Sequence, residues 1–590
     1  MGGAYAREHA LEDDEDTRAF ELGAILAQKA IAFEDEACRE LFTAEELQIL
    51  EEEQSSVWSH PLLLYLVIAL CSVCAAVQGM DGGQRGQLFC TKQFGIGGSD
   101  PRSTWLTGLV NSAPYMCSAF VGCWFTIPYN NWFGRRGTIF ITCLFSALAC
   151  FWQGFVNSWW HMFIARFVLG FGIGPKSATV PIYAAECAPP KIRGALVMQW
   201  QVWTAFGIML DYAADLAFYN VPDKHDITGL NWRIMMASAM LPAVIVCCFV
   251  FKCPESPRWY MSKGRHAAAY QSLCRLRKHK IQAARDVFYM NEGLKAESEM
   301  ANIRQSKVRE MITVPRNRHA LFASEILVFM QQASTHSSRI SLTQANPSKF
   351  CGVNVIAYYS SEVFIQSGFS ELNALAASLG FRVINFIFAI PDFITIDSFG
   401  RRNLLLVTFP LMSVCLLFTG FSFFIPEGST AQVACIALGI YLFGCVYSPG
   451  AGPVPFTYSA EAYPLHVRTY GMSLATATTW FFNFILSITW PSMQAAFTNQ
   501  GAFGWYAAWN TIGFVMVMLF VPETKSRSLE ELDAVFAVPT RTQAAQGLEE
   551  LQYLFNRYIL RSVTLEPLID WEKVRAANNA QDAQPETQEA

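Results

Sequence analysis

Long uncharged apolar runs alternate with short polar segments along most of the chain, and these runs predict helices that cross a membrane. A helix needs about 20 apolar residues to span the hydrocarbon core of a bilayer. Six such runs precede residue 252 and six follow residue 319. They cover 61–80, 104–127, 138–156, 160–183, 195–218, 232–251, 320–365, 371–396, 403–425, 432–458, 470–497 and 503–521. The pattern predicts an all-α polytopic membrane protein with twelve transmembrane helices.

The composition agrees with this prediction and excludes other classes of protein. Hydrophobic residues make up 52% of the 590 residues and charged residues only 15%, whereas a soluble domain carries about 25% charged residues. A soluble enzyme, a secreted disulfide scaffold and a disordered acidic protein are therefore excluded. The net charge of −5 and the short basic loops give no nucleic-acid footprint. The cysteines lie mostly in apolar tracts and act there as small hydrophobes, so we expect no metal site.

Charge divides the chain into five parts. Residues 1–60, here called the leader, hold 16 acidic and 4 basic residues, while 252–319 hold 15 basic and 6 acidic ones. The leader has no cleavable signal peptide, and Thr43 and Glu46 have the spacing of a helical capping box. The predicted division is a cytoplasmic tail at 1–60, bundles at 61–252 and 320–522, a cytoplasmic helical linker at 253–319 and a cytoplasmic tail at 523–590.

Basic residues in alternate loops predict the orientation. Lys and Arg accumulate on the cytoplasmic side of membrane proteins, and here they follow the even-numbered apolar runs. Both termini and the central linker are therefore expected in the cytoplasm.

Three motifs recur once in each half. Residues 183–193 return at 458–468 with five identical positions, Gly134–Arg136 returns as Gly400–Arg402, and Pro254–Ser256 returns as Pro522–Thr524. The offsets of 275, 266 and 268 residues indicate parallel repeats, hence two six-helix bundles.

Each repeat places carboxylates and arginines at cytoplasmic helix ends. We interpret them as a cytoplasmic gate that holds the two bundles together; the alternative is anchoring by side chains that reach the membrane surface. The gate residues are Arg135, Arg136, Glu186, Arg193, Glu255, Arg258, Arg401, Arg402, Glu461 and Arg468.

Two of the ionisable residues in or next to the apolar runs point to a function. Asp81 ends the first run and Arg166 lies inside the fourth. A charge in the bilayer costs several kcal/mol unless it has a partner, so an Asp81–Arg166 pair could hold a carboxylate that binds protons. The alternative is that Asp81 only marks the end of its helix.

These motifs resemble those of the sugar porter family of the major facilitator superfamily, over roughly residues 60–536. The matching segments are 131–137, Arg166 with its glycines, 181–194, 254–258, 397–402 and 521–525. The resemblance implies two six-helix bundles, a cytoplasmic helical linker and alternating access around a sugar site in the middle of the membrane.

The resemblance also implies the residues of that site. Amide side chains suit sugar hydroxyls, and an aromatic face suits the C–H side of the ring. The matching positions are Gln201, Gln331, Gln332, Asn354, Asn385, Phe456 and Trp480. Asp81 corresponds to the aspartate of proton-coupled members, with Arg166 as its expected partner.

The predicted function is therefore proton-coupled import of a monosaccharide or polyol, such as a hexose, a pentose or inositol. Alternatives are an uncoupled facilitator and a nutrient sensor that does not transport. We expect no enzymatic activity and no cofactor, the proton being the coupling ion. The expected partners are the sugar and the bilayer, and the expected form is a monomer in the plasma membrane.

Two segments depart from the family pattern. Residues 333–349 separate Gln332 from Phe350, where family members have no insert. The insert is polar and would interrupt a membrane helix, so our hypothesis is an unspliced intron. Arg85 follows Asp81 by four residues, and a nearby cation favours the ionised carboxylate and opposes proton capture.

Overall fold

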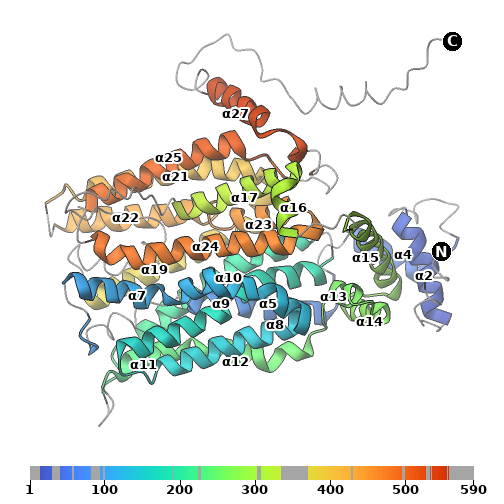
Figure 1. The fold of residues 1–590 in the computed structure, drawn as a ribbon, viewed down its shortest axis with the longest axis horizontal. Helices are drawn as coiled ribbons and strands as arrows, with labels where there is room; N and C mark the ends of the chain where they lie inside the picture. The colour runs from blue at the N-terminus through green and yellow to red at the C-terminus, as the bar shows by residue number, and fades with distance from the viewer. Residues whose placement is uncertain are drawn as a thin grey trace.

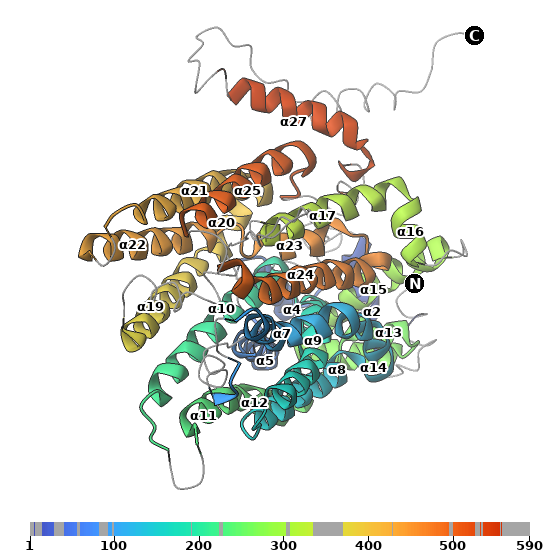
Figure 2. The ribbon, with the colours of Figure 1, turned by 60° about the vertical axis from the view of Figure 1, so that its left-hand side comes forward.

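The computed structural model describes residues 5, 14–28, 40–55, 59–81, 93–96, 100–189, 192–223, 228–301, 307–333, 370–426, 429–494, 499–525, 532, 535–554 and 556. Every regular element among these residues is a helix. The helices run roughly side by side in two groups, with a smaller helical part at one end (Figures 1 and 2).

The first group contains the helices that follow the leader. They are α5 (Leu62–Met80), α7 (Pro101–Cys117), the π-helical turn η2 (Ser118–Gly122), α8 (Cys123–Gln153), α9 (Trp159–Cys187), α10 (Arg193–Phe218), α11 (Leu230–Ser238) and α12 (Met240–Phe249), which ends in a 3₁₀ turn, η4 (Val250–Lys252). The label α8 covers two expected spans, because the chain turns at Gly134, where φ is 73° and ψ is −176°. Only glycine adopts this backbone conformation readily.

The second group follows the linker. It contains α16 (Lys307–Thr313), α17 (Pro315–Ala333), α19 (Glu371–Ala389), α20 (Asp392–Phe399), α21 (Arg401–Ser422), α22 (Thr430–Tyr447), α23 (Val454–Ala462), α24 (Leu465–Gln494), α25 (Asn499–Phe520) and α27 (Thr540–Leu554). Gly400 turns the chain between α20 and α21 with φ of 94°, as Gly134 does within α8.

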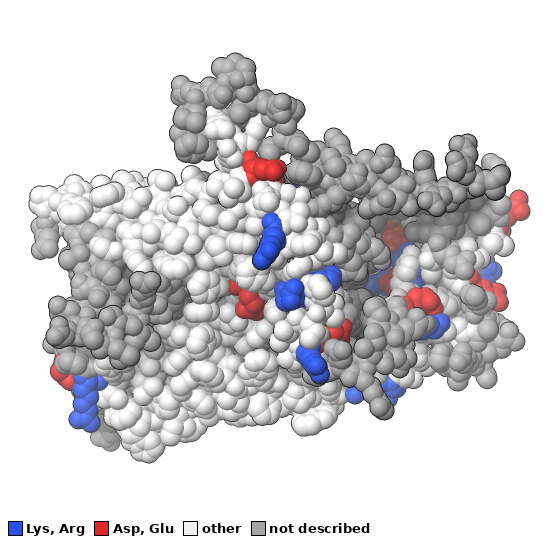
Figure 3. Space-filling view, turned by 45° about the horizontal axis from the view of Figure 1, so that its top comes forward, with Lys and Arg blue, Asp and Glu red and all other residues white. Residues whose placement is uncertain are grey.

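The outer faces of the helices suit a lipid environment. Val407, Val414 and Phe421, spaced seven apart on α21, are 60%, 63% and 64% exposed. Charged side chains are sparse over much of one face and gather toward the end that carries the linker (Figure 3). Such exposed apolar stripes would be unfavourable in water but are the normal surface of a helix in a bilayer.

Glycines allow close packing inside the first group. A Cβ on Gly170 would lie 2.5 Å from the carbonyl oxygen of Pro114, and one on Gly174 would lie 2.7 Å from the backbone of Gly122. Helix α9 therefore approaches α7 and η2 with backbone against backbone, which is the usual way in which membrane helices pack.

The two groups meet along two helix pairs. Helix α7 packs against α24, and α10 packs against α19. At one such contact Phe206 of α10 lies 5.3 Å from Phe386 of α19, measured between ring centroids. These pairs form the interface between the two bundles.

The leader and the linker form one helical unit at the end of the bundles. Helices α2 (Asp14–Gln28) and α4 (Ala44–Ser55) lie beside α13 (Pro257–Ser262), α14 (His266–Leu276) and α15 (Lys280–Ala301) (Figure 1). We call these five helices the leader–linker unit. Its core is apolar and includes the fully buried Phe20, Leu26 and Leu273.

Charges on the two segments pair across this unit. Lys280 contacts Glu15 at 3.0 Å and Asp16 at 2.9 Å, and Arg285 contacts Glu53 at 2.7 Å. The two carboxylates hold the pKa of Lys280 above its usual range. The acidic leader and the basic linker are thus electrostatic partners as well as neighbours.

The described helices agree with the expected fold class. Eight helices or fused helices in the described residues are long and apolar enough to cross a membrane, and one of them, 105–153, joins two expected spans. The count of twelve stays a prediction, since the seventh expected span continues into 334–369. The insert at 333–349, apart from Ala333, lies outside the described residues, as does Arg85.

The leader is more ordered than isolated short helices would be. The capping box is formed, since Thr43 N donates to Glu46 Oε2 at 2.7 Å and Glu46 N donates to Thr43 Oγ1 at 3.3 Å. The predicted boundary of the tail at residue 60 stays a prediction, and α2 and α4 of this segment pack on the linker helices.

Candidate functional site

A fully buried ion pair lies at the end of α5. Asp81 follows the last residue of that helix, and its Oδ2 lies 2.6 Å from Nζ of Lys176 on α9. Both side chains are 0% exposed. Ser146 of α8 donates to the same carboxylate oxygen at 3.0 Å, and Lys176 also donates to Ser146 Oγ at 3.2 Å. Three helices of one bundle thus satisfy this carboxylate, as a charge at membrane depth requires.

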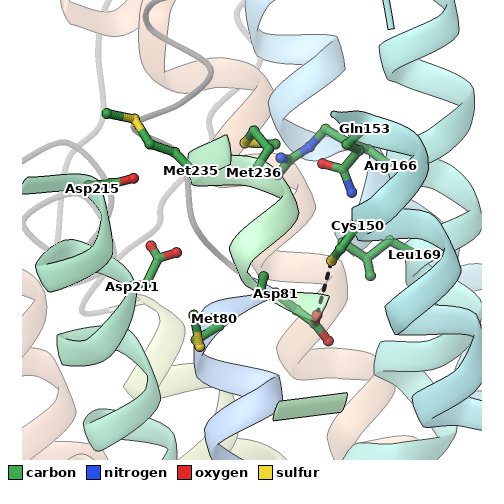
Figure 4. A pocket seen from close by; sticks show the side chains of 11 residues that line it. Met80, Asp81, Cys150, Gln153, Arg166, Leu169, Asp211, Asp215, Met235 and Met236 are labelled. Atoms are coloured by element: carbon green, nitrogen blue, oxygen red, sulfur yellow. Dashed lines mark hydrogen bonds between the residues drawn. The ribbon is translucent and has the colours of Figure 1, made fainter. Parts of the chain in front are cut away.

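This pairing differs from the expected one. The sequence predicted Arg166 as the partner of Asp81; the described ion pair is with Lys176, a residue that the prediction did not include. The signal was present, because Lys176 is a charged residue inside an apolar run. Arg166 is also buried and lines a pocket that Asp81 reaches from the other side (Figure 4).

That pocket is unusually polar for the interior of a helix bundle. It lies between α5, α8, α9, α10 and α11, toward the end of the bundle away from the leader–linker unit. Figure 4 shows Asp211 and Asp215 of α10 on one side and Gln153 and Arg166 on the other. Methionines and Cys150 complete its wall; Cys150 Sγ lies 3.7 Å from Asp81 Oδ1.

In the second bundle, two amide side chains predicted for the sugar site contact the segment that separates α22 from α23. Gln331 of α17 donates through Nε2 to the carbonyl oxygens of Ala451 and Gly452, at 2.9 and 2.7 Å. Ser448 Oγ donates to Asn385 Oδ1 of α19 at 2.7 Å. Residues 448–453 separate α22 from α23, and free backbone carbonyls there need such donors inside a membrane.

An aromatic pair joins the two bundles near this region. Trp480 of α24 stacks on Tyr115 of α7, with ring centroids 5.5 Å apart and planes 3° from parallel. Trp480 also packs against a buried apolar cluster of the first bundle that includes Met80, the neighbour of Asp81. The predicted tryptophan is therefore half-buried between the bundles.

The remaining predicted sugar-site residues are distributed around these groups. Gln332 is buried on α17, while Gln201 of α10 and Phe456 of α23 are half-buried. A neighbour, Gln199, donates to the Ser72 hydroxyl and, at 3.2 Å, to the Ile68 carbonyl oxygen of α5. Asn354 lies outside the described residues. The described contacts thus gather Gln331 and Asn385 at one turn and Trp480 at the bundle interface.

The repeated motifs form a charge network in the first bundle. Arg135 donates from Nε and Nη2 to the two oxygens of Glu186, both at 2.9 Å. Glu255 accepts from the backbone N–H groups of Arg135 and Ser256 at 3.0 and 2.9 Å. Burial raises the pKa of Glu255, whereas the N–H donors and the Arg136 charge act in the opposite direction. Ser256 also donates to Glu186, so one network joins α8, α9 and the start of the linker.

The second bundle repeats this network. Arg401 donates from Nε and Nη2 to Glu461 at 3.1 and 2.8 Å. Glu523 accepts from the backbone of Arg401 and Arg402, both at 3.0 Å. Thr524 Oγ1 donates to Glu461 at 3.1 Å, as Ser256 does to Glu186. The sequence repeat is therefore also a repeat of hydrogen bonds.

The predicted role of these residues as a gate between the bundles stays a prediction. The described ion pairs of both networks join residues of the same bundle. Arg402 pairs with Glu550 of α27 at 2.7 Å, and Arg468 donates to the carbonyl of Tyr463 at 3.3 Å. Arg258 acts on Glu186 electrostatically, and the side chain of Arg193 is not described. The networks fix helix ends within each bundle, because their charges sit at turns that only neighbouring helices reach.

Comparison with known proteins identifies the family to which this architecture belongs. The family model "Sugar (and other) transporter" matches residues 67–536. A myo-inositol transporter, FST1, of Gibberella moniliformis is 28% identical over 488 residues, which cover 81% of this chain and 79% of that protein. The galactose-proton symporter of Escherichia coli (strain K12) is 29% identical over 404 residues, covering 68% and 80%.

Solved structures give the same fold. The proton:xylose symporter XylE, bound to 6-bromo-6-deoxy-D-glucose, matches with a TM-score of 0.67 at 24% identity, covering 80% of this chain and 99% of that one. A partially occluded inward-open form of XylE from E. coli matches with a TM-score of 0.64 at 23% identity, covering 79% and 99%. With two bundles, repeated networks at equivalent turns and a family match over most of its length, the chain belongs to the sugar porter family of the major facilitator superfamily.

Proposed function

We propose that this transporter imports a monosaccharide or a polyol together with a proton by alternating access. The observation that carries the proposal is the group of buried ionisable side chains at one end of the first bundle: Asp81, Arg166, Lys176, Asp211 and Asp215. Sugar binding by itself does not require charges there, and ionisable groups at membrane depth are costly and typically serve ion or proton movement.

The sugar site of this proposal lies between the bundles. Trp480 offers an aromatic face, and Gln331, Gln332 and Asn385 offer amides from the second bundle. Gln201 offers an amide from the first. Hydroxyl groups of a sugar exchange hydrogen bonds with such amides, while the C–H face of its ring packs on an aromatic side chain.

Polyols and cyclitols are the substrate class that we favour. Relatives include myo-inositol transporters of Gibberella moniliformis and Schizosaccharomyces pombe and two putative polyol transporters of Arabidopsis thaliana. Proton-coupled relatives include galactose and arabinose symporters of E. coli. These names support both the substrate class and the coupling ion of the proposal.

The remaining expectations follow from the same fold. The polar leader–linker unit and the networks at Glu255 and Glu523 belong at the cytoplasmic face, so both termini are cytoplasmic. One chain contains both bundles and all proposed site residues, hence a monomer suffices. The plasma membrane is the proposed location and no cofactor is required.

An uncoupled facilitator is the second candidate, and one contact favours it. Lys176 Nζ lies 2.6 Å from Asp81 Oδ2, so the carboxylate already has a counter-ion within its own bundle. If Asp81 were the sole proton carrier, this lysine would have to withdraw in each transport cycle.

Uptake in a yeast strain without sugar transporters distinguishes the two. Radiolabelled myo-inositol, D-galactose and D-xylose are offered at acidic and neutral pH, with and without an uncoupler. Chains with and without residues 333–349 are compared, with the transcript sequenced across that segment. Accumulation against the gradient that the uncoupler abolishes supports symport; uptake that only equilibrates, and ignores the uncoupler, establishes the facilitator. Surface expression without any uptake contradicts both.

A further inference from the structure

The pocket between α5 and α10 contains two carboxylates to which the proposed function gives no separate role. Asp211 and Asp215 lie four residues apart on α10, so they occupy one face of that helix. They are 6% and 3% exposed, and both point toward the pocket (Figure 4). Two carboxylates this close and this buried repel each other when both are ionised.

A hydrogen-bond donor lies on the pocket wall opposite the two carboxylates and can bind a ligand. Gln153 of α8 is 1% exposed and lines the pocket beside Arg166 (Figure 4). Among the residues that the structure describes, its Nε2 has no hydrogen-bond acceptor. A buried amide N–H without an acceptor is unfavourable, and a water molecule or a carboxylate oxygen within the pocket would satisfy it.

The other bundle supplies an arginine to the same region. Arg382 of α19 is 2% exposed, and its Cζ lies 5.0 Å from the ring centroid of Tyr212, the neighbour of Asp211. Asp211 interacts electrostatically with Asp215, Arg382, Arg166 and Asp81. Because α10 and α19 belong to different bundles, Arg382 is the one of these partners that moves relative to Asp211 when the bundles rock.

We propose that Asp211 and Asp215 form a second proton-binding site, which Arg382 empties when the bundles close on this side. In the closed arrangement the guanidinium provides the counter-charge of the pair. When α19 moves away, a proton from water forms an O–H bond with one carboxylate oxygen and replaces that counter-charge. Closure returns Arg382 and displaces the proton into the pocket, where Asp81 is the next carboxylate.

The surroundings of the pair favour this role over that of Asp81. Asp81 is held by Lys176 and Ser146 from helices of its own bundle, so rocking of the bundles does not separate them. Facing the pair are Asp81 of α5, Cys150 of α8, Arg166 of α9 and Arg382 of α19; α11 contributes the uncharged Met235 and Met236. Farther along the same interface, Tyr219 donates to Glu371 at 3.4 Å, and α20 carries the buried Asp392.

The test rests on the proposed function. Its outcomes distinguish a failure of the second proton-binding site from a failure of the proposed symport. Purified protein in liposomes is assayed for accumulation driven by a proton gradient and for counterflow, in which labelled and unlabelled sugar exchange without net proton movement. The probes are myo-inositol, D-galactose and D-xylose. The variants are Asp211→Asn with Asp215→Asn, each single change, Arg382→Gln, and the control Asp223→Asn, whose carboxylate accepts from Gly229 and Leu230 in a loop.

We expect the double variant to lose accumulation down to the level of empty liposomes while counterflow continues. Arg382→Gln removes the cation that displaces the proton, so accumulation should fall and should recover only where the compartment that receives the proton is more alkaline. A merely structural role would reduce both assays together without moving the pH profile. Full accumulation by the double variant overturns the inference and leaves symport standing, whereas counterflow without accumulation by the unmodified protein refutes symport itself.

A second measurement needs neither sugar nor an active double variant. Infrared difference spectra between acidic and neutral pH report carbonyl bands of carboxyl groups that gain protons. The unmodified protein should show a buried carboxyl band that weakens in each single variant and is unchanged in Asp223→Asn. An identical band in both single variants and the unmodified protein contradicts the assignment.

Discussion

The Asp81–Lys176 pair is the most demanding contact at the scale of single residues. Both charges are completely buried, and hydroxyl and thiol groups from α8 surround them. A buried ion pair contributes little net stability compared with an apolar pair of similar size, yet loss of one partner leaves an uncompensated charge. Replacement of one partner should therefore destabilise the protein far more than replacement of both.

Lys176→Met should destabilise the protein by about 3–5 kcal/mol, because Asp81 then stays buried without its partner. The double variant Lys176→Met with Asp81→Asn should recover most of this loss. Thermal unfolding in detergent, followed by size-exclusion chromatography, measures both. Equal destabilisation by the single and double variants would show that the pair is not coupled. Lys263→Met, on the exposed linker surface, serves as the control.

Gly134 and Gly400 form the chain turns at the two repeated networks. A Cβ at either position would lie 2.5 Å from a carboxylate oxygen, of Glu255 or of Glu523 respectively. Gly264 has a similar φ of 69° but open space around the Cβ position. The three glycines therefore separate the cost of backbone strain from the cost of displacing a carboxylate.

Alanine at Gly134 or Gly400 should lower the unfolding temperature and reduce transport, whereas Gly264→Ala should show only the strain of about 1–2 kcal/mol. Transport by Gly264→Ala should stay unchanged, since no network carboxylate is near. Uptake assays combined with thermal unfolding check this. Indistinguishable behaviour of the three variants would mean that the carboxylates yield without cost.

Sequence spacing predicted residues better than it predicted their partners. The motifs located Glu186, Glu255 and Arg135 correctly at helix ends, because each stands beside a glycine or proline that marks a turn. Arg166, the predicted partner of Asp81, and Lys176, its described partner, both lie on α9, ten residues or about 15 Å apart. Position along one helix does not reveal which of them comes level with the end of another helix.

At the scale of elements, the leader helices depend on the linker for their stability. Helices of 12 and 15 residues are marginal in isolation, and here α2 buries Phe20 and Leu26 completely against linker side chains. Sequence alone gave the capping box of α4 because that signal is local. The docking of α2 depends on residues more than 200 positions away, which no local pattern specifies.

Phe20→Ala should release α2 from the linker, since loss of a buried phenylalanine costs about 3–5 kcal/mol. Limited proteolysis should then cut the leader faster while the membrane helices stay intact. Glu21→Ala changes the exposed neighbour on the same helix and should leave the cleavage rate as it was. Unchanged cleavage of Phe20→Ala would indicate that the ion pairs of Lys280 and Arg285 suffice to hold the leader.

At the scale of the whole molecule, two closely packed helix pairs connect the bundles. Gly108 of α7 lies against the backbone of α24, where a Cβ would come 2.6 Å from the carbonyl oxygen of Ile488. Backbone contact of this kind allows no side chain between the helices. The separation of α7 and α24 is therefore a direct measure of how far the bundles have opened at this end.

Gly108→Leu should force α7 from α24 and favour the conformation that is open at this end of the bundles. Cysteine labelling at Tyr115→Cys, a position that is 1% exposed, should become faster in that background. Gly504→Leu on α25, where a Cβ meets open space, is the matched control. If labelling proceeds at one rate in both backgrounds, the α7–α24 contact does not govern opening.

The ion pairs between leader and linker also determine how many linker cations are available to a membrane surface. Lys278, Lys280 and Arg285 are each engaged by leader carboxylates, at 2.9, 2.9 and 2.7 Å. A basic side chain near an anionic leaflet gains about 1 kcal/mol from the lipid headgroups. In the cytoplasmic orientation proposed above, a chain without its first 55 residues should present three additional cations to phosphatidylserine, and the leader would act as an internal substitute for anionic lipid.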